Sequence, residues 1–194
     1  MTLTKKQAAA IDRIIAKTPP HHRDQAGENS VVYRGEDDGI VITNGHVLLH
    51  APEPLGYRAP KKYDPRTADK LNAYIHAPFE DYIGDFFKVV APIQLEKCAS
   101  TLRKGLKKHA FLSSVDKIEV VRFTAMDLED KSLKSAFAVD SVVDAFEAVG
   151  KDAVGYIGSS SAVPCPAPYM IVEPANGYGN LKIGIHALVM PCRY

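Results

Sequence analysis

The chain has 194 residues, 46% of them hydrophobic and 24% charged, and its 24 Lys and Arg residues against 23 Asp and Glu residues give a net charge of +1. That composition excludes disordered, collagen-like and coiled-coil classes, and no apolar run is long enough to span a membrane. The near-neutral charge excludes a strongly basic nucleic-acid binder, although a single charged face stays compatible with it. An amphipathic N-terminal segment and three widely spaced cysteines predict a soluble, cytoplasmic protein with no signal peptide and no disulfide framework.

The first predicted element is a helix at the N-terminus. Thr4 and Gln7 have the spacing of a capping box, which satisfies free backbone N–H groups at the start of a helix. Ile11 and Ile14 recur at helical spacing among basic residues, and Pro19 ends the segment. This pattern predicts an amphipathic helix with one buried face.

Three short apolar runs next predict a β-meander. They lie at about 31–33, 40–42 and 46–50 and are separated by turn residues. Between the second and third runs, Asn44-Gly45 is typical of a type I′ turn, which needs a positive φ at both central residues. We therefore expect a tight hairpin at this point.

The middle of the sequence is less regular. Prolines interrupt residues 53–85, which we interpret as an elaborated connection with space for one short helix near 66–74. A strand is predicted at 86–90 and a second helix from Pro92, with an apolar stripe that ends at Leu106. The flank of this helix is basic, and its cations are candidate contacts to DNA phosphates: Lys97, Arg103, Lys104, Lys107 and Lys108. An ordinary solvated helix face is the alternative.

The last part of the sequence is more regular. Strands are predicted at 118–124 and 136–139, followed by a helix with Asp140 as N-cap and Gly150 as a left-handed C-terminal residue. Further strands are predicted at 153–157, 169–173 and 182–190. The chain thus repeats a strand, a short helix and a meander, in units of about 1–52, 86–134 and 135–194. Because each helix has one apolar stripe, we expect a single α+β module with the helices on one face of antiparallel sheets.

The sequence contains no common catalytic motif: no P-loop, no G-x-S-x-G, no H-E-x-x-H and no C-x-x-C. His46 and His50 would lie about 13 Å apart along a strand at ~3.3 Å per residue, which is too far to share a metal ion. The serine-rich stretch at 158–161 is followed by prolines rather than by a helix, so a connection between strands is a better interpretation than a nucleophile or phosphate loop. We therefore expect no enzyme activity, no metal site and no cofactor.

Three segments resemble bacterial replicative sliding clamps, the β subunit of DNA polymerase III. The tail 188–194 resembles the terminal V-M-P-M-R-L of that family, and residues 42–48 resemble its A-T-D-G-H-R-L-A hairpin. Residues 137–149 resemble the F-x-V-x-Y-L-L-D-A-L-x-A-L strand and helix that precede the tail, and residues 151–154 follow in the expected place. The segments occur in the family's order.

The resemblance implies a clamp-like α+β fold that forms a ring around double-stranded DNA, with helices lining the hole, and a non-enzymatic role as a replication-associated processivity factor. It also implies a hydrophobic pocket that captures short linear peptides of replication or repair proteins. Carried over to the matching positions, the peptide-binding residues are Thr43, Gly45, His46, Leu48, Leu188, Met190, Pro191 and Arg193. The implied partners are duplex DNA, such peptides and further copies of the chain. The alternative is that these residues only form a buried hairpin and a C-terminal edge strand.

Departures from the family keep other interpretations open. Asn44 stands in place of an Asp and Val47 in place of an Arg, while Cys192 and Tyr194 replace a Met and a Leu in the tail. Without the Arg of the clamp hairpin, this wall of the pocket has fewer hydrogen-bond donors, so the pocket would select different peptides. A bacterial clamp chain has three domains of two units each, whereas this chain has about three units, which leaves the number of chains in a ring open. A monomeric or dimeric protein-interaction module on the same fold, and an enzyme of unrecognised class, are the alternatives.

Overall fold

The structure, a computed structural model, describes residues 1–17, 32–34, 39–52, 55–56, 86–90, 102–115, 117–125, 134–158, 169–177 and 180–192. The described helices are α1 (Lys5–Ala16), α4 (Leu102–Lys107) and α5 (Val139–Val149). The described strands are β1 (Val32–Arg34), β2 (Ile40–Thr43), β3 (Val47–Ala51), β4 (Phe86–Val90), β5 (Phe111–Leu112), β6 (Glu119–Ala125), β7 (Lys134–Ala138), β8 (Ala153–Gly158), β9 (Tyr169–Pro174) and β10 (His186–Val189). The predicted α+β class is confirmed.

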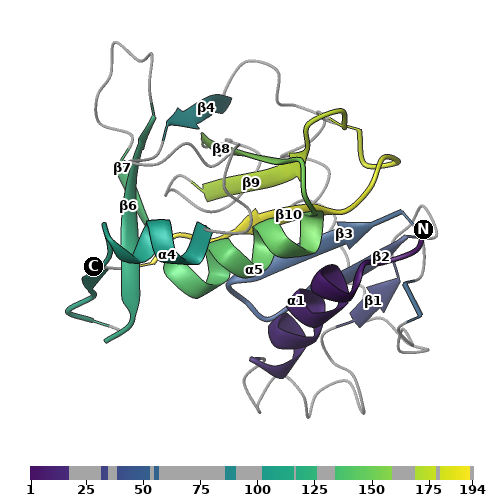
Figure 1. Ribbon diagram of the computed structural model, residues 1–194, viewed down its shortest axis with the longest axis horizontal. Coiled ribbons are helices and arrows are strands. Elements are labelled where there is room, and N and C mark those ends of the chain that lie inside the picture. The colour runs from purple at the N-terminus through teal and green to yellow at the C-terminus, as the bar shows by residue number, and fades with distance from the viewer. Residues whose placement is uncertain are drawn as a thin grey trace.

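All strand pairs are antiparallel, and the described strands form one ten-stranded sheet in the order β1-β2-β3-β10-β9-β8-β4-β6-β5, with β7 paired to β6 beside this path. The predicted meander is confirmed as β1-β2-β3, and β8-β9-β10 forms a second one. Figure 1 shows β3, β10 and β9 as neighbours at the centre of the sheet, with β6 and β7 steeply inclined to them at the left. The two meanders therefore meet through their last strands.

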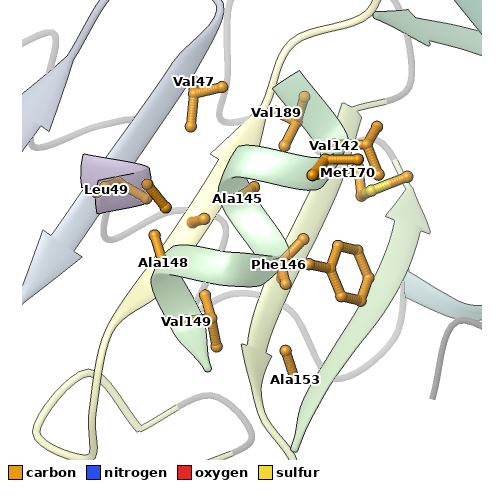
Figure 2. Packing of buried hydrophobic residues seen from close by; sticks show 14 of the residues in the cluster. Val47, Leu49, Val142, Ala145, Phe146, Ala148, Val149, Ala153, Met170 and Val189 are labelled. Atoms are coloured by element: carbon orange, nitrogen blue, oxygen red, sulfur yellow. The ribbon is translucent and has the colours of Figure 1, made fainter. Parts of the chain in front are cut away.

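The helices lie on one side of this sheet, in front of it in Figure 1. Val142, Phe146 and Ala148 of α5 belong to one buried cluster with residues of three neighbouring strands, Leu49, Met170 and Val189. Figure 2 shows Val142 beside Met170 and Val189, and Ala148 on the side of Leu49. Burial of one such side chain stabilises the fold by about 1.5–3 kcal/mol relative to exposure. The helices α1 and α4 add further buried side chains to this core: Ala10, Ile11 and Ile14 from α1, and Leu102 and Leu106 from α4.

The ring of Phe146 also explains a glycine in β8. A Cβ atom on Gly155 would come within 2.8 Å of the Phe146 Cζ atom, so the ring occupies the space that any larger residue would need. Tight interiors do not easily absorb such an overlap. Gly155 therefore allows α5 to approach β8 closely.

Gln7 joins the start of α1 to the end of α5. The capping box is confirmed, because the Gln7 backbone N–H donates to Thr4 Oγ1 at 3.2 Å and the Thr4 N–H donates to Gln7 Oε1 at 3.1 Å. The Gln7 Nε2 group then donates to the carbonyl oxygens of Ala148 at 3.2 Å and Val149 at 3.1 Å. These two carbonyl groups belong to the last turn of α5, where backbone carbonyls have no N–H partner within the helix.

Ion pairs connect the remainder of these two helices. Arg13 Nε lies 2.8 Å from Asp144 Oδ1, and Lys17 Nζ lies 2.8 Å from Asp144 Oδ2. Arg13 also contacts Glu147 at 2.5 Å, and Lys6 contacts it at 3.4 Å. Burial opposes the charge of Arg13, but the hydrogen bonds and charges of Asp144 and Glu147 outweigh it and raise the pKa of the guanidinium. The start of α1 contacts the end of α5, and the end of α1 contacts the start of α5. The two helices therefore run antiparallel.

Several predicted element ends differ from the structure. The helix α5 begins at Val139 with Ala138 at the N-cap and no capping side chain, so Asp140 lies in the first turn rather than at the cap. Gly150 is the C-cap and has a positive φ, but its φ of 128° and ψ of −166° lie outside the left-handed helical region. The last strand is shorter than 182–190 because turns occupy residues 181–184, where Gly184 has a φ of 73°.

Two further predictions lie outside the described residues. These are the short helix near 66–74 and the start of the second helix at Pro92. The described part of that helix is α4, in which the predicted apolar residues Leu102 and Leu106 are buried.

Candidate functional site

The candidate site starts at the β2–β3 hairpin, whose position was predicted correctly but whose turn type was not. The Asn44 N–H donates to the Val47 carbonyl oxygen at 3.2 Å, so Gly45 and His46 are the central residues. Gly45 has a φ of 85°, and Asn44 and His46 have negative φ values. A positive φ at the first central residue alone is the requirement of a type II′ turn, not of type I′.

Asn44 has a structural role in this turn. Its buried side-chain oxygen accepts hydrogen bonds from the N–H groups of His46 at 2.9 Å and Val47 at 2.8 Å. Thr43 Oγ1 accepts a further bond from the Gly45 N–H at 3.1 Å. An Asp at position 44 could accept the same bonds, so the exchange of Asp for Asn relative to the clamp hairpin preserves this geometry.

The C-terminal segment lies directly beside this hairpin. Strand β10 pairs with β3 in a register that sets Leu188 opposite Leu48. The Met190 N–H then donates to the His46 carbonyl oxygen at 2.8 Å, which extends the contact to the tip of the hairpin. The structure therefore brings together two segments that lie far apart in the sequence.

The predicted peptide-binding residues divide into a buried and an accessible group. Leu48 and Leu188 are 6% and 2% exposed and lie on the sheet face turned away from the helices, in line with Ile171 of β9. The accessible group consists of the exposed Gly45 and His46 and the half-buried Thr43, Met190 and Pro191. Arg193 lies outside the described residues. A ligand that approaches this place meets the hairpin tip and Met190 first.

Buried polar groups follow the two leucines along the same strands. His186 lies opposite His50 across the β3–β10 pair, and its Nε2 atom is 3.1 Å from the Gly177 carbonyl oxygen and 3.9 Å from Glu173 Oε2. Burial lowers the pKa of His186 below its ordinary value. The Gly177 carbonyl opposes this effect, and the neighbouring His50 adds to it. His186 is therefore neutral at pH 7, a feature that the sequence pattern did not indicate.

The predicted DNA-binding cations lie on and after α4. Arg103, Lys104, Lys107 and Lys108 are all exposed, whereas Lys97 lies outside the described residues. The structure pairs Arg103 with Asp140 of α5, and Lys107 Nζ with Glu119 Oε2 of β6 at 3.0 Å. In the part of the chain that the structure describes, Lys104 and Lys108 have no carboxylate partner.

Asp140 connects the cations of α4 to those of α1. It accepts a hydrogen bond from Arg103 and lies 3.7 Å from Lys17 Nζ. Partial burial raises the pKa of Asp140, but the hydrogen bond from Arg103 and the positive charges of Lys17 and Arg103 prevail and lower it. These ion pairs were not predicted from the sequence, although the acids of α5 recur at three- and four-residue spacing, which places them on one helix face.

The described residues contain no cluster of three His, Cys, Asp or Glu side chains that could hold a metal ion. Within the same ranges, no helix combines the length and hydropathy that crossing a bilayer would need. Comparison with protein-family models finds none that matches this chain, and comparison with curated proteins finds no significant match.

Proposed function

We propose that the chain is a clamp-like, non-enzymatic protein that tethers replication or repair proteins to DNA, with a peptide-binding site where the β2–β3 hairpin meets the residues after β10. One observation carries this proposal: Leu188 lies opposite Leu48, and Met190 is hydrogen-bonded to His46. The two segments that resemble the pocket walls of sliding clamps are therefore neighbours. A soft Met side chain beside a polar turn suits a peptide with an apolar anchor.

The arrangement of elements supports a clamp-like repeat. One helix and one meander form α1-β1-β2-β3, and a second set forms α5-β8-β9-β10. The sets meet through the antiparallel pair β3–β10 and through the antiparallel contact of α1 with α5. Both contacts are those that a local two-fold axis between two related units produces, and clamp domains consist of two such units.

For DNA, the proposal assigns phosphate contacts to the α4 region. Lys104 and Lys108 are exposed and are not neutralised by a described carboxylate. Such contacts bind duplex DNA without base recognition, which suits a protein that slides.

A second candidate function is a monomeric or dimeric protein-interaction module that uses the same peptide site and does not encircle DNA. The pairing of Arg103 with Asp140 and of Lys107 with Glu119 favours it, because half of the described cations of this face are already partnered. Solution mass separates the two candidates, since a ring around a duplex requires an oligomer of this chain.

The peptide site is tested by fluorescence anisotropy with a labelled hexapeptide that ends in Leu-Phe. We expect His46→Ala and Met190→Ala each to weaken binding about tenfold, which is ~1.4 kcal/mol. The matched controls are His109→Ala and Ile183→Ala, which remove an exposed imidazole and an exposed apolar side chain elsewhere. No binding by the unmodified protein, or unchanged binding by both site variants, would refute the site.

Truncation of the tail is a poor test of this site. Leu188 and Val189 are buried in β10, which pairs with a strand on each side. Their removal would damage the centre of the sheet, and a loss of binding would then report unfolding. Substitutions at accessible positions avoid this ambiguity.

A further inference from the structure

The hairpin formed by β5 and β6 exposes an unusual amount of apolar surface. The described residues include six exposed large hydrophobic side chains, and four of them are on this hairpin: Phe111, Leu112, Val115 and Ile118, which are 37% to 64% exposed. The other two, Met1 and Ile183, lie elsewhere in the chain. Scattered apolar side chains are ordinary on a protein surface, whereas a cluster of them marks a site of association.

The cluster surrounds a strand edge. Strand β5 is the last in the order of the sheet, and no described strand pairs with its outer edge. Phe111 lies opposite Val120 and Leu112 lies opposite Glu119, so the two apolar side chains point to opposite faces of the sheet. An extended peptide that pairs with this edge would also place its side chains alternately on the two faces, where each could contact one of them.

Backbone hydrogen bonds link the described residues at the two ends of the turn in this hairpin. The Ser113 N–H donates to the Ile118 carbonyl oxygen at 2.9 Å, and the Lys117 N–H donates to the Ser113 carbonyl oxygen at 3.2 Å. Lys117 is the one non-glycine residue with a positive φ, 56°, in the described ranges. The guanidinium of Arg122 lies 5.3 Å from the centre of the Phe111 ring, which fixes that ring from one side. These contacts restrain the hairpin backbone and the Phe111 ring, and such restraint lowers the entropy cost of association.

Among the described residues, the charged side chains of this part of the chain are mainly positive. Lys117 of the hairpin and Lys108, three residues before Phe111, are exposed, and Arg122 lies over the Phe111 ring. Glu119, the described acid of the hairpin, pairs with Lys107. Two copies of this edge would bring like charges together across the new strand pair, which is destabilising. An acidic partner would be complementary, and electrostatic attraction would speed its association.

We propose that the β5 edge binds an extended acidic peptide that adds one strand to the sheet. Its apolar side chains contact Phe111 and Ile118 on one face and Leu112 on the other, and its carboxylates lie near Lys108 and Lys117. This site is separate from the β3–β10 site and does not depend on the function proposed for it.

The test uses two labelled peptides, an octapeptide of alternating Glu and Val and its counterpart of alternating Lys and Val. We expect the acidic peptide to bind the full chain and the basic one to bind at least about tenfold more weakly. Leu112→Ser and Ile118→Ser should each reduce binding of the acidic peptide about tenfold, and Lys117→Glu should reduce it by a similar factor. Ile183→Ser is the matched control, an exposed apolar residue outside the hairpin, and should bind as the unmodified chain does.

Three results would overturn this proposal. They are no binding of the acidic peptide, equal binding of both peptides, and unchanged binding by Leu112→Ser. Native mass spectrometry adds a fourth: a dimer of the unmodified chain that dissociates in Leu112→Ser would assign the edge to a second copy. Chemical shifts of the Phe111 and Leu112 amides, followed by NMR during the titration, must move if the peptide pairs with β5.

Discussion

Asp144 gives the most direct test of how α1 attaches to α5. Its side chain is 1% exposed and accepts hydrogen bonds from Arg13 and Lys17, both at 2.8 Å. Hydrogen bonds that involve charged groups contribute about 1.5–3 kcal/mol each, but Arg13 and Lys17 are 39% and 42% exposed, so solvent reduces both contributions. We therefore expect Asp144→Ala to lower the free energy of unfolding by about 2–3 kcal/mol.

Removal of the two cations instead of the carboxylate should lower the free energy of unfolding further. Replacement of both Arg13 and Lys17 by Ala leaves the Asp144 carboxylate buried without its two cations, a change that costs about 3–5 kcal/mol. The triple variant that also carries Asp144→Ala should recover part of this loss, because no buried charge then remains. Urea unfolding at pH 7, followed by circular dichroism, gives these values, and Lys5→Ala at an exposed position of α1 is the control. Equal losses below about 0.5 kcal/mol in the single and double variants would refute the buried ion pairs.

Further substitutions test other contacts of the fold. Gln7→Ala should lower the free energy of unfolding by about 1–2 kcal/mol, because it removes the α1 cap and the α5 carbonyl partners together. Gly155→Ala should lower the free energy of unfolding by about 1–3 kcal/mol, because the new methyl group overlaps with Phe146. The double variant Gly155→Ala with Phe146→Leu should lose less than the sum of the two single losses. The lowered pKa of His186 means that the unfolded chain binds a proton first as the pH falls below about 6.5. The free energy of unfolding should then fall by up to about 1.4 kcal/mol per pH unit until the folded pKa is reached, a dependence that His186→Gln removes and that His109→Gln, at an exposed position, retains. Urea unfolding at pH 7.5 and at pH 5.5 measures this dependence. If the free energy of unfolding changes by the same amount between the two pH values in all variants, this last expectation is wrong.

Local signals in the sequence predicted much of the sheet and the start of α1. Thr4 and Gln7 form the capping box because both partners lie within one turn, and the order of the first three strands follows from short loops between apolar runs. The position of the hairpin at Gly45 could be predicted for the same reason, because its turn residues are neighbours in the sequence. Its turn type was wrong because the side chain of Asn44 caps the turn from outside the two central positions.

Features that depend on distant residues could not be predicted in this way. The hydrophobic run at 182–190 includes Ile183 and Ile185, and the turn at Gly184 lies between Ile183 and the segment that continues into β10. Asp140 has the residue type of an N-cap, but the helix begins one residue earlier and the carboxylate pairs with Arg103 instead. Strand β5 has two residues, too few for a periodic pattern, and exists because β6 is beside it.

The pairing of the α4 cations also determines how the DNA proposal can fail. If all four described cations contact phosphates, Arg103 and Lys107 must first leave Asp140 and Glu119, and the slope of log K against log salt should be about −3.6 at ~0.9 per phosphate. If only Lys104 and Lys108 bind, the slope should be about −1.8, and Lys104→Gln with Lys108→Gln should abolish it. Because these weak contacts cannot hold a lone chain on DNA at physiological salt, a slope near −1.8 is compatible with tethering only in an oligomer that multiplies the contacts. A monomer with that slope would therefore exclude the clamp-like role and leave the protein-interaction module. The control is the double variant Lys151→Gln with Lys182→Gln. If it weakens DNA binding as much as the α4 variant does, α4 is not the DNA contact.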